Sequence, residues 1–437
     1  MAMAQASVTD AGGPAIPLPP RARLVLYVLC AVYVLNFLDR SLLGTLAKPI
    51  EESLHIDDAQ LGRLGGLYFA LFYCLIAVPV GWFADRTSRV GVLSLACAIW
   101  SGATMACGFA ATYPQLAAAR MAVGFGEAGG VPPSYAIITD TIPPGRRGFA
   151  FGIYNLGPVL GAALGVAFGA SIAAAFDWRW AFIAIGAIGV VAAVVVRLLI
   201  REPARGTFDP DHDTTAKAPF WPTVRMFVTH PVLMPMALGS GATQFVTYGL
   251  GNFAALFLGR EKGMSLGQIA IWYSLAIVLG MGSGMLVSGR VIDRRVGRSK
   301  AAYAGVPALS LAIAVPFYLA FVWAPAWQLA LPFLTVAMFF NYFYLSSAVA
   351  LVQEEVRPDQ RVLASALLLL VMNFIGLGLG PTWVGWASSW FASRQVAHPL
   401  QLALYTLTPF YLVAILLFLA LARVLRREDL ARRSEMP

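Results

Sequence analysis

Charged side chains are scarce in this sequence. Asp, Glu, Lys and Arg together make up only 12% of the 437 residues, whereas 59% are hydrophobic. A soluble domain has roughly 25% charged residues, and the mean hydropathy here is +0.72. This composition excludes an ordinary soluble protein and predicts an integral membrane protein that crosses the bilayer many times.

Cysteines and histidines are also few, and nucleotide-binding motifs are missing. The four cysteines lie inside apolar runs and lack the paired spacing of metal ligands, so we expect small packing residues and no metal site. The four histidines lie outside the apolar runs, which argues against a histidine proton relay. The sequence has no Gly-Lys-Ser/Thr phosphate-binding loop and no soluble catalytic domain. It therefore indicates neither an enzyme nor a bound cofactor.

The apolar residues form about twelve runs of roughly 20–28 residues, and each run is long enough to cross the bilayer as one helix. A long polar stretch separates the first six runs from the last six. We therefore predict an all-α membrane protein with twelve transmembrane helices in two six-helix bundles. The approximate limits of the runs are 24–48, 61–84, 90–112, 115–139, 147–174, 179–200, 231–259, 267–291, 300–324, 326–353, 361–388 and 399–424.

These runs divide the chain into five segments. We predict a disordered cytoplasmic N-terminal tail, an N-terminal six-helix bundle, a cytoplasmic interdomain loop, a C-terminal six-helix bundle and a cytoplasmic C-terminal tail. In that order, their limits are 1–23, 24–200, 201–230, 231–424 and 425–437. The N-terminal residues lack a basic region followed by an early apolar run, so they do not resemble a cleaved signal.

Lysine and arginine are distributed unevenly over the connections between the runs. If the N-terminus is cytoplasmic, the cytoplasmic connections and tails hold about 23 of the 31 basic residues, and the outer loops hold about six. This is the positive-inside asymmetry of membrane proteins. It predicts that both termini are cytoplasmic, and it accounts for the net charge of +9 without a nucleic-acid partner.

A short motif occurs twice, once at the end of the second run and once at the end of the eighth. Its copies begin at Gly81 and Gly289, about 208 residues apart, and each continues with an Asp-Arg pair four residues later. The matching positions indicate that the two halves are parallel, pseudo-symmetric repeats. We expect a cytoplasmic gate here, in which aspartates accept hydrogen bonds from arginines. The candidate gate residues are Gly81, Asp85, Arg86, Arg89, Arg146, Arg147, Asp293, Arg294 and Arg298.

Two pairs of charged residues lie inside the predicted helices. Asp39 and Arg40 follow about 22 Å of helix in the first run, and Arg120 lies about 8 Å from the outer end of the fourth, so we expect them at a similar depth. Glu127 is on nearly the same face as Arg120 and about 10 Å deeper. Ionisable groups in hydrocarbon are costly unless paired or hydrated, so this balanced set of two acids and two bases predicts a functional cavity.

Motifs along nearly the whole chain resemble the major facilitator superfamily. They are the doubled loop motif, residues 152–161 in the fifth run, and Asp177-Trp-Arg-Trp-Ala-Phe182. Three further stretches resemble its Spinster branch: Asn36-Phe-Leu-Asp39-Arg40, residues 65–73, and Arg120-Met-Ala-Val-Gly-Phe-Gly-Glu127-Ala128. The resemblance implies a proton-linked carrier with these four charged residues in its cavity. Spinster-type carriers are associated with lysophospholipids and sphingolipids in animals.

The four charges allow three interpretations. Burial raises the pKa of a carboxylate and a nearby arginine lowers it, so a carboxylate between these influences can change ionisation when a helix moves. In the interpretation we favour, Asp39 or Glu127 exchanges its arginine for a proton, and protons are the coupling ion. In the second, the arginines bind an anion without proton exchange. In the third, the charges are a static network that holds two helices together.

The second half contributes aromatic and amide side chains instead of charges at mid-depth. If these face the cavity, one wall is charged and the other aromatic, which suits an amphiphile whose head binds the arginines. Asn341 and Tyr342 are favoured contacts because polar groups avoid lipid. The candidate substrate-binding residues are Asn36, Arg40, Arg120, Tyr248, Asn252, Asn341, Tyr342 and Asn373.

Glycines recur every four residues in the fifth run, which gives one smooth helix face for close contact. In the family that the chain resembles, runs five and eight meet across the two halves, so we expect this face to let the halves rock. Pro158 is expected to bend its helix. The alternative is packing without movement. The candidate hinge residues are Gly157, Pro158, Gly161, Gly165, Gly280 and Gly284.

Together these patterns predict a proton-coupled secondary transporter that moves a lysolipid- or sphingolipid-like amphiphile by alternating access. One alternative is a proton symporter or antiporter of small organic anions or drugs. An alternative of another class is a lipid sensor or receptor that transports nothing. We expect a monomeric, multi-pass protein of the bacterial inner membrane, whose partners are membrane lipids and a small amphiphilic or anionic substrate.

Overall fold

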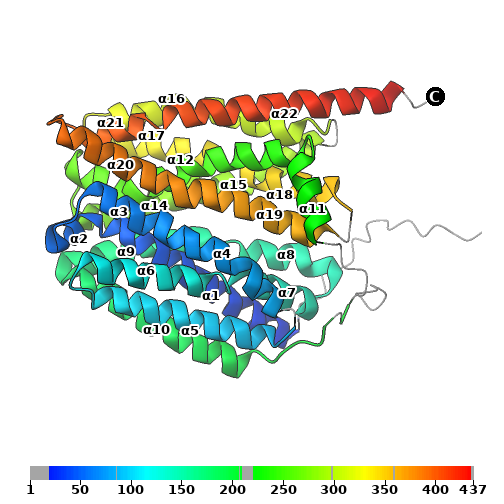
Figure 1. The fold of residues 1–437 in the computed structure, drawn as a ribbon, viewed down its shortest axis with the longest axis horizontal. Helices are drawn as coiled ribbons and strands as arrows, with labels where there is room; N and C mark the ends of the chain where they lie inside the picture. Colours follow the sequence, from blue (N-terminus) through cyan, green and yellow to red (C-terminus); the bar gives the residue numbers. More distant parts are fainter. Residues whose placement is uncertain are drawn as a thin grey trace, which may run out of the picture.

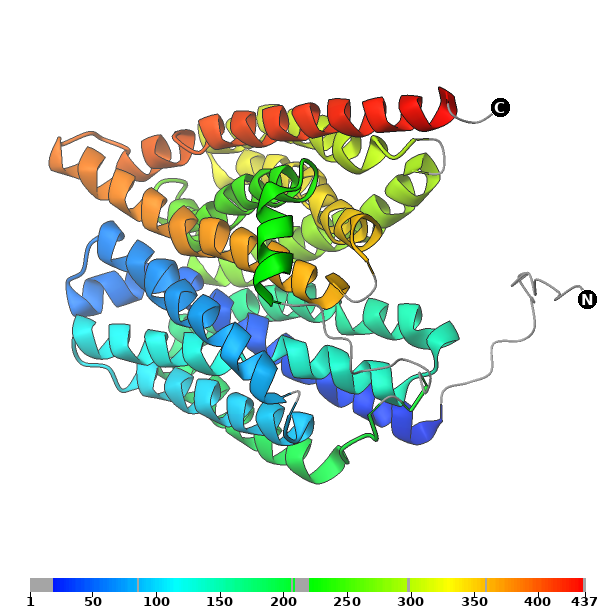
Figure 2. The ribbon, with the colours of Figure 1, turned by 45° about the vertical axis from the view of Figure 1, so that its right-hand side comes forward.

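The computed structural model describes residues 19–84, 86–205, 207–208, 220–296, 299–357 and 360–434. All regular secondary structure within these ranges is helical. The helices of the first half and those of the second half form two groups that lie side by side (Figure 1). The same division is visible in the turned view, in which the blue-to-cyan helices lie below the orange-to-red ones (Figure 2). The predicted fold, an all-helical protein in two bundles, is confirmed.

The first half contains ten helical segments. They are α1 (Pro20–Thr45), α2 (Ala47–Leu54), α3 (Asp58–Gly65), α4 (Leu67–Ala84), α5 (Arg89–Gly108), α6 (Tyr113–Glu127), α7 (Val131–Thr141), α8 (Pro144–Tyr154), α9 (Gly157–Ala175) and α10 (Trp178–Leu199).

The second half begins with α11 and includes three π-helical segments. Its elements are α11 (Phe220–Thr229), α12 (Leu233–Arg260), α13 (Leu266–Gln268), η1 (Ile269–Tyr273), α14 (Ser274–Ile277), η2 (Val278–Gly282), α15 (Ser283–Val296), α16 (Ala302–Trp323), α17 (Trp327–Asn341), α18 (Phe343–Glu355), α19 (Arg361–Asn373), η4 (Phe374–Leu379), α20 (Gly380–Ser393), α21 (Pro399–Tyr405) and α22 (Thr408–Ser434).

Ten helical stretches in the described ranges are long and apolar enough to cross a membrane. Two further stretches, α6 with α7 and the 28-residue α12, fill the places where the fourth and seventh spans were predicted. The first of these carries Arg120, Glu127 and Asp140, which lower its hydropathy. The structure is therefore consistent with twelve spans.

The predicted segment limits need three corrections. Helix α1 begins at Pro20, inside the predicted N-terminal tail, because proline is well suited to the first turn of a helix. The predicted interdomain loop contains α11. The predicted C-terminal tail is helical as far as Ser434, because α22 continues beyond its apolar part into a run of charged residues.

The predicted glycine hinge lies in a different place from the one expected. A Cβ atom at Gly161 would lie 2.4 Å from the carbonyl oxygen of Val34, and one at Gly165 would lie 2.6 Å from that of Leu38. Gly157 faces Tyr33, so these three glycines of α9 pack against α1 within the first half. The expectation that this glycine face joins the two halves is therefore wrong.

The candidate hinge residues of the second half behave in the same way. Cβ atoms at Gly280 and Gly284 would lie 2.7 Å and 2.3 Å from backbone oxygens of α17. Pro158 occupies the first turn of α9, directly after the break between α8 and α9, so the fifth span is interrupted next to this proline. Helix α9 does meet the eighth span, through Val159 and Gly282 among others.

The halves approach most closely at the end of the molecule formed by α2, α3, α20 and α21, which we call the closed end. It lies at the left of Figure 1, opposite the end of α22. A Cβ atom at Gly385 of α20 would lie 2.2 Å from the carbonyl oxygen of Asp58, and one at Gly62 would lie 2.4 Å from that of Pro381. Backbone therefore packs directly on backbone between the halves at this end.

Candidate functional site

The four charged residues predicted to share a site are brought together by α1 and α6. The Nε atom of Arg40 lies 2.6 Å from Oε2 of Glu127, and Nη1 of Arg120 lies 3.6 Å from Oδ1 of Asp39. Two ion pairs therefore run between the same two helices. This follows from their spacing, because Asp39 and Arg40 are adjacent while Arg120 and Glu127 are seven residues apart on one face.

The cluster is packed rather than open. Asp39, Arg120 and Glu127 retain only 1–2% of their exposure, and the side chain of Arg40 retains 12%. The prediction of a wet cavity around these residues therefore does not describe this conformation. Charges buried to this degree must be paired, and the equal number of acids and bases meets that requirement.

One member of the cluster was missed in the sequence. Thr104 of α5 donates a hydrogen bond to Oδ2 of Asp39, and it also lies 2.9 Å from the carbonyl oxygen of Trp100. A hydroxyl has one hydrogen, so Thr104 can alternate between Asp39 and its own helix. No spacing rule indicates such a contact, because Thr104 is one of several small polar residues in apolar runs.

Hydrogen bonding in the cluster is incomplete. Oε1 of Glu127, Oδ1 of Asn36 and Nε of Arg120 are buried and have no hydrogen-bond partner among the described residues. Buried polar atoms are usually satisfied, and those that are not often mark functional positions. The unpaired oxygen of Glu127 is therefore a position at which a proton can add.

Aromatic rings surround the Arg40 guanidinium. Its Cζ atom lies 4.9 Å from the ring centre of Phe37, 5.0 Å from Phe69 and 5.1 Å from Tyr73. These distances allow cation–π attraction, which helps to hold a cation away from water. Tyr248 of α12, in the other half, also lies beside Arg40. Arg40 is thus the member of the cluster that contacts both halves.

Two of the predicted substrate contacts in the second half line a small cavity. It has a volume of about 50 Å³, and Asn341 and Tyr342 border it together with Thr247 and Tyr273. Nδ2 of Asn341 donates to Oγ1 of Thr247 over 2.6 Å. Its Oδ1 atom has no hydrogen-bond partner in the described part of the chain. The cavity is mostly apolar with one free amide oxygen.

The remaining predicted contacts lie apart from this cavity. Asn252 packs between the halves, where Cβ atoms at Gly44 and Gly65 would meet its backbone and side-chain oxygens at 2.7 Å and 2.3 Å. Its Nδ2 donates to the carbonyl oxygen of Tyr248, so Asn252 is a packing residue in this conformation. Asn373 is half-buried on α19.

The predicted cytoplasmic gate is only partly described. Asp85 and Arg298 lie outside the described residues, while Asp293 and Arg294 are exposed on α15 and Gly81 lies on α4. Three of the other gate arginines make contacts within the first half. Arg89 pairs with Asp140, Nη1 of Arg86 donates to Trp82 over 3.3 Å, and Nε of Arg147 donates to Ile142 over 3.2 Å.

Two arrangements at this end were not predicted. The carboxylate of Glu202 accepts hydrogen bonds from Ser88 and from the N–H groups of Arg89 and Val90, so it caps α5. Burial raises the pKa of Glu202, but these hydrogen bonds outweigh it and hold the pKa below its ordinary value. In the second half, Glu355 pairs with Lys300.

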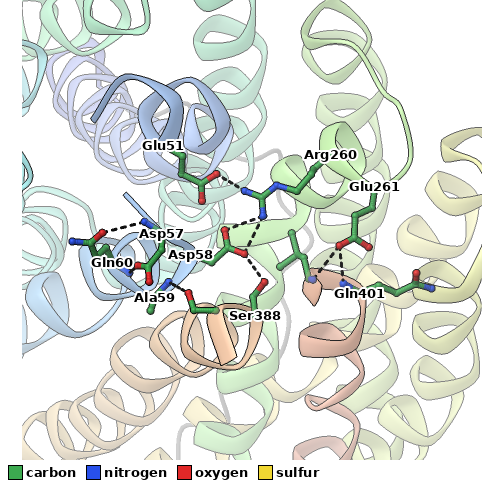
Figure 3. Close-up of polar contacts among 11 residues, drawn as sticks. Glu51, Asp57, Asp58, Ala59, Gln60, Arg260, Glu261, Ser388 and Gln401 are labelled. Carbon is green, nitrogen blue, oxygen red and sulfur yellow. Dashed lines mark hydrogen bonds and ion pairs between the residues drawn. The ribbon is translucent and has the colours of Figure 1, made fainter. Parts of the chain in front are cut away.

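A second charged cluster lies at the closed end. It consists of Glu51, Asp58, Arg260 and Ser388, and it joins the two halves (Figure 3). Sequence reasoning placed Arg260 in an outer loop and did not single out the two acids. Glu51 and Asp58 lie seven residues apart across a turn, and this spacing does not by itself indicate a shared site.

The fold and the buried charges together define a multi-pass integral membrane protein. The chain belongs to the Major Facilitator Superfamily, whose family model matches residues 29–381. Members of this family are transporters, so the protein is a transporter and not an enzyme.

Three relatives make the comparison more specific. An efflux pump of this superfamily from Mycolicibacterium smegmatis is 31% identical over 391 residues, which is 89% of this chain and 90% of that protein. Protein spinster homolog 1 of Homo sapiens is 29% identical over 249 residues, 56% of this chain and 47% of the human protein. A crystal structure of a bacterial homologue of the human lysosomal transporter Spinster, inward-facing and unoccupied, has a TM-score of 0.86 at 30% identity and covers 94% of this chain and 99% of that one. The resemblance to the Spinster branch is confirmed.

Proposed function

We propose that this transporter is driven by protons and moves an amphiphilic, lysolipid- or sphingolipid-like substrate by alternating access. The observation that carries the proposal is the Arg40–Glu127 pair. Glu127 has one oxygen bound to Arg40 and one buried oxygen without a partner among the described residues. Arg40 in turn contacts Tyr248 in the second half. One carboxylate therefore controls the arginine that contacts both bundles.

Proton binding to Glu127 would release Arg40. A proton that adds to the carboxylate removes its negative charge, so the attraction to the guanidinium is lost and Arg40 becomes available to an anionic head group. The charge of the site is then balanced by the substrate. Asp39 and Arg120 form a second, longer ion pair between the same two helices, with Thr104 as a hydroxyl that can follow either state.

The lipid-like substrate is supported by the shape of the second half. The cavity beside Asn341 and Tyr342 is lined mainly by apolar and aromatic side chains. An acyl chain matches this lining in polarity and a polar head matches the arginines, and the cavity of about 50 Å³ would have to widen to hold the chain. The match to human Spinster homolog 1 spans 56% of this chain, so the similarity by itself does not assign that protein's substrate to this transporter.

A small organic anion is the second candidate, and one observation favours it. Nε and Nη1 of Arg120 are buried and have no hydrogen-bond partner among the residues that the structure describes. Guanidinium donors that lack a hydrogen bond can bind the oxygens of an anion. In this case Arg40 and Arg120 would form a clamp for the anion.

We further propose that both termini are cytoplasmic and that the membrane is the bacterial inner membrane. Basic residues are in excess on the side of the membrane where the two termini lie, which supports this orientation. The closed end is then the outer end, and the conformation faces inward, as does the similar bacterial Spinster homologue.

Uptake into proteoliposomes with a set proton gradient tests the function. We expect flux of a lysolipid that depends on the gradient, and the loss of that dependence in Asp39→Asn and Glu127→Gln. Glu52→Gln, an exposed acid on α2, is the control and should transport normally. Flux of small carboxylates without lysolipid flux would favour the second candidate. Tight lipid binding without any flux would favour a sensor, and proton-driven flux in both acid variants would reject the coupling role.

A further inference from the structure

The closed end carries a charged cluster that is separate from the central one. Its four side chains come from four helices: Glu51 from α2, Asp58 from α3, Arg260 from α12 and Ser388 from α20 (Figure 3). The first two helices belong to the first half and the last two to the second half. Opening of the closed end would therefore break the polar contacts that join α2 and α3 to α12 and α20.

Arg260 is the centre of the cluster. Its Nη1 atom lies 2.9 Å and 3.0 Å from the two carboxylate oxygens of Asp58, and its Nη2 atom pairs with Oε2 of Glu51. Ser388 also donates a hydrogen bond to Asp58 across the halves. Figure 3 shows the guanidinium between the two carboxylates. Across the halves, Asp58 thus contacts both Arg260 and Ser388, whereas Glu51 pairs with Arg260.

The charges of this cluster do not balance. Two carboxylates face one guanidinium, and the side chains of Glu51 and Asp58 are only 9% and 8% exposed. Oε1 of Glu51 is buried without a hydrogen-bond partner among the described residues. A cavity of about 270 Å³ borders Glu51, Asp58 and Arg260, and Asp57 lies on its wall.

The other charged groups around Glu51 do not supply the missing positive charge. From α3, Asp57 accepts a hydrogen bond from the N–H of Gln60. From α12, Glu261 accepts from two N–H groups at the start of α21 and lies 3.8 Å from His398.

The nearby cations are exposed or bound elsewhere, and Lys48, three residues before Glu51 on α2, is among the exposed ones. Lys262 donates to the carbonyl oxygen of Val322, and Arg179 of α10 donates to Ser53 and pairs with Asp177. With both acids ionised, the cluster would therefore hold an uncompensated negative charge, which is costly in a buried place.

We propose that Glu51 is a proton site of the outer gate, which binds a proton when the closed end shuts and releases it when that end opens. The proton comes from the solution on that side and adds to the Glu51 carboxylate. The cluster then becomes neutral, with Asp58 still ionised against Arg260. When the halves separate, Arg260 and Ser388 leave with the second half, and Glu51 is exposed to water and loses the proton. The proposal rests on the alternating access of the proposed function, but it does not depend on proton binding at Glu127.

The direction of the pH effect follows from the environment of Glu51. Burial, and then the carboxyl group of Asp58, raise the pKa of Glu51 to about 9 although Arg260 acts in the opposite sense. A glutamate in water has a pKa of about 4.3. A group whose pKa is higher in the closed state stabilises that state at low pH and ceases to do so as the pH rises toward 9. Acid should therefore shut this end, and alkali should open it.

Spin-label distances at the closed end test this in the full-length protein without substrate. The four native cysteines are replaced by alanine, and labels are placed at Ala111→Cys and Gln328→Cys, both exposed and one in each half. We expect a short distance at pH 5 and a growing long-distance population toward pH 9. Glu51→Gln, which carries no titrating proton, should keep the short distance throughout this range. A matched control, Glu52→Gln, should respond like the parent.

Two further outcomes decide the assignment. Asp58→Asn removes the neighbouring carboxyl group that raises the pKa of Glu51, so the midpoint of opening should move to lower pH. A parent without any pH response, a Glu51→Gln variant that responds like the parent, or an unmoved midpoint in Asp58→Asn would each overturn the proposal. Loss of the response in Glu127→Gln with its retention in Glu51→Gln would assign the proton to the central cluster alone. Because this measurement uses neither substrate nor flux, its failure leaves the transport assay unaffected.

Discussion

The two charged clusters of this protein use the same residue types for different purposes. The central cluster has two acids and two arginines, all from α1 and α6 of the first half. The cluster at the closed end has two acids and one arginine, and it is divided between the halves. A charge pair within one half can change its protonation without breaking a contact between halves. A charge pair that joins the halves cannot change its protonation without affecting such a contact, so its protonation is coupled directly to opening.

Their burial differs in the same sense. Asp39 and Arg120 are 1% and 2% exposed, whereas the side chain of Arg260 is 32% exposed. Removal of one partner from a deeply buried pair leaves an uncompensated charge. Removal of Arg260 leaves charges that water can reach once the end opens. We therefore expect the first cluster to control stability and the second to control the balance between conformations.

The largest expected effect is that of Arg120→Ala. The variant leaves Asp39 buried with Thr104 as its remaining partner, which should destabilise the protein by about 3–5 kcal/mol. The melting temperature in detergent measures this. The double variant with Asp39→Ala should recover part of the loss, because no charge is then left unpaired. Arg260→Ala should melt closer to the parent but favour the long spin-label distance. Equal melting of all three variants with the parent would contradict the distinction.

An intermediate effect is expected when a glycine is replaced by alanine, either at a contact between the halves or at a contact within one half. Gly385→Ala places a Cβ atom 2.2 Å from the backbone of Asp58, so the halves must move apart. Gly161→Ala places one 2.4 Å from the backbone of Val34, within one half. Overpacking of this kind costs about 1–3 kcal/mol. The first should lengthen the spin-label distance, and the second should lower the melting temperature with the distance unchanged. Gly152→Ala, which meets nothing within 4 Å, is the control.

The smallest effect is expected at Glu202, an exposed acid that acts within the first half. Glu202→Gln should destabilise the protein by about 1 kcal/mol, the usual value of a helix cap. Because its pKa is lowered in the folded state, the stability it contributes is present above about pH 4.3 and is lost as the pH falls through that lowered pKa. Melting measured from pH 7 to pH 3 should show a smaller acid-induced loss in the variant than in the parent. A change in the spin-label distance would contradict a role confined to one half.

The central cluster could be predicted from the sequence because its physical signal is strong. Charged residues in apolar runs are rare and costly, so Asp39, Arg40, Arg120 and Glu127 stand out at once. Their depths follow from the rise of a helix, and antiparallel neighbours then bring the acids to the arginines. The site is completed from other helices by Thr104, Phe69 and Tyr73. These could not be predicted, because the spacing of residues along a helix does not tell which of its faces contacts a neighbouring helix.

The closed end could not be predicted in this way. Glu51, Asp58 and Arg260 lie at the ends of apolar runs, where charged residues are ordinary. The glycines of α9 were conspicuous but pack inside one half, whereas Gly62 and Gly385, which stand in no such repeat, carry the contact between halves. Regular spacing identifies a smooth helix face but does not identify the partner of that face.

The sequence alone determined that this protein is a two-bundle membrane transporter with paired charges buried in its first half, because hydropathy and the cost of charge in lipid act along the chain. The tertiary structure alone decided which ends of the two bundles close on each other, and that two acids there share one arginine. Contacts of that kind join residues about 200 positions apart and depend on how whole bundles dock, which no local pattern encodes.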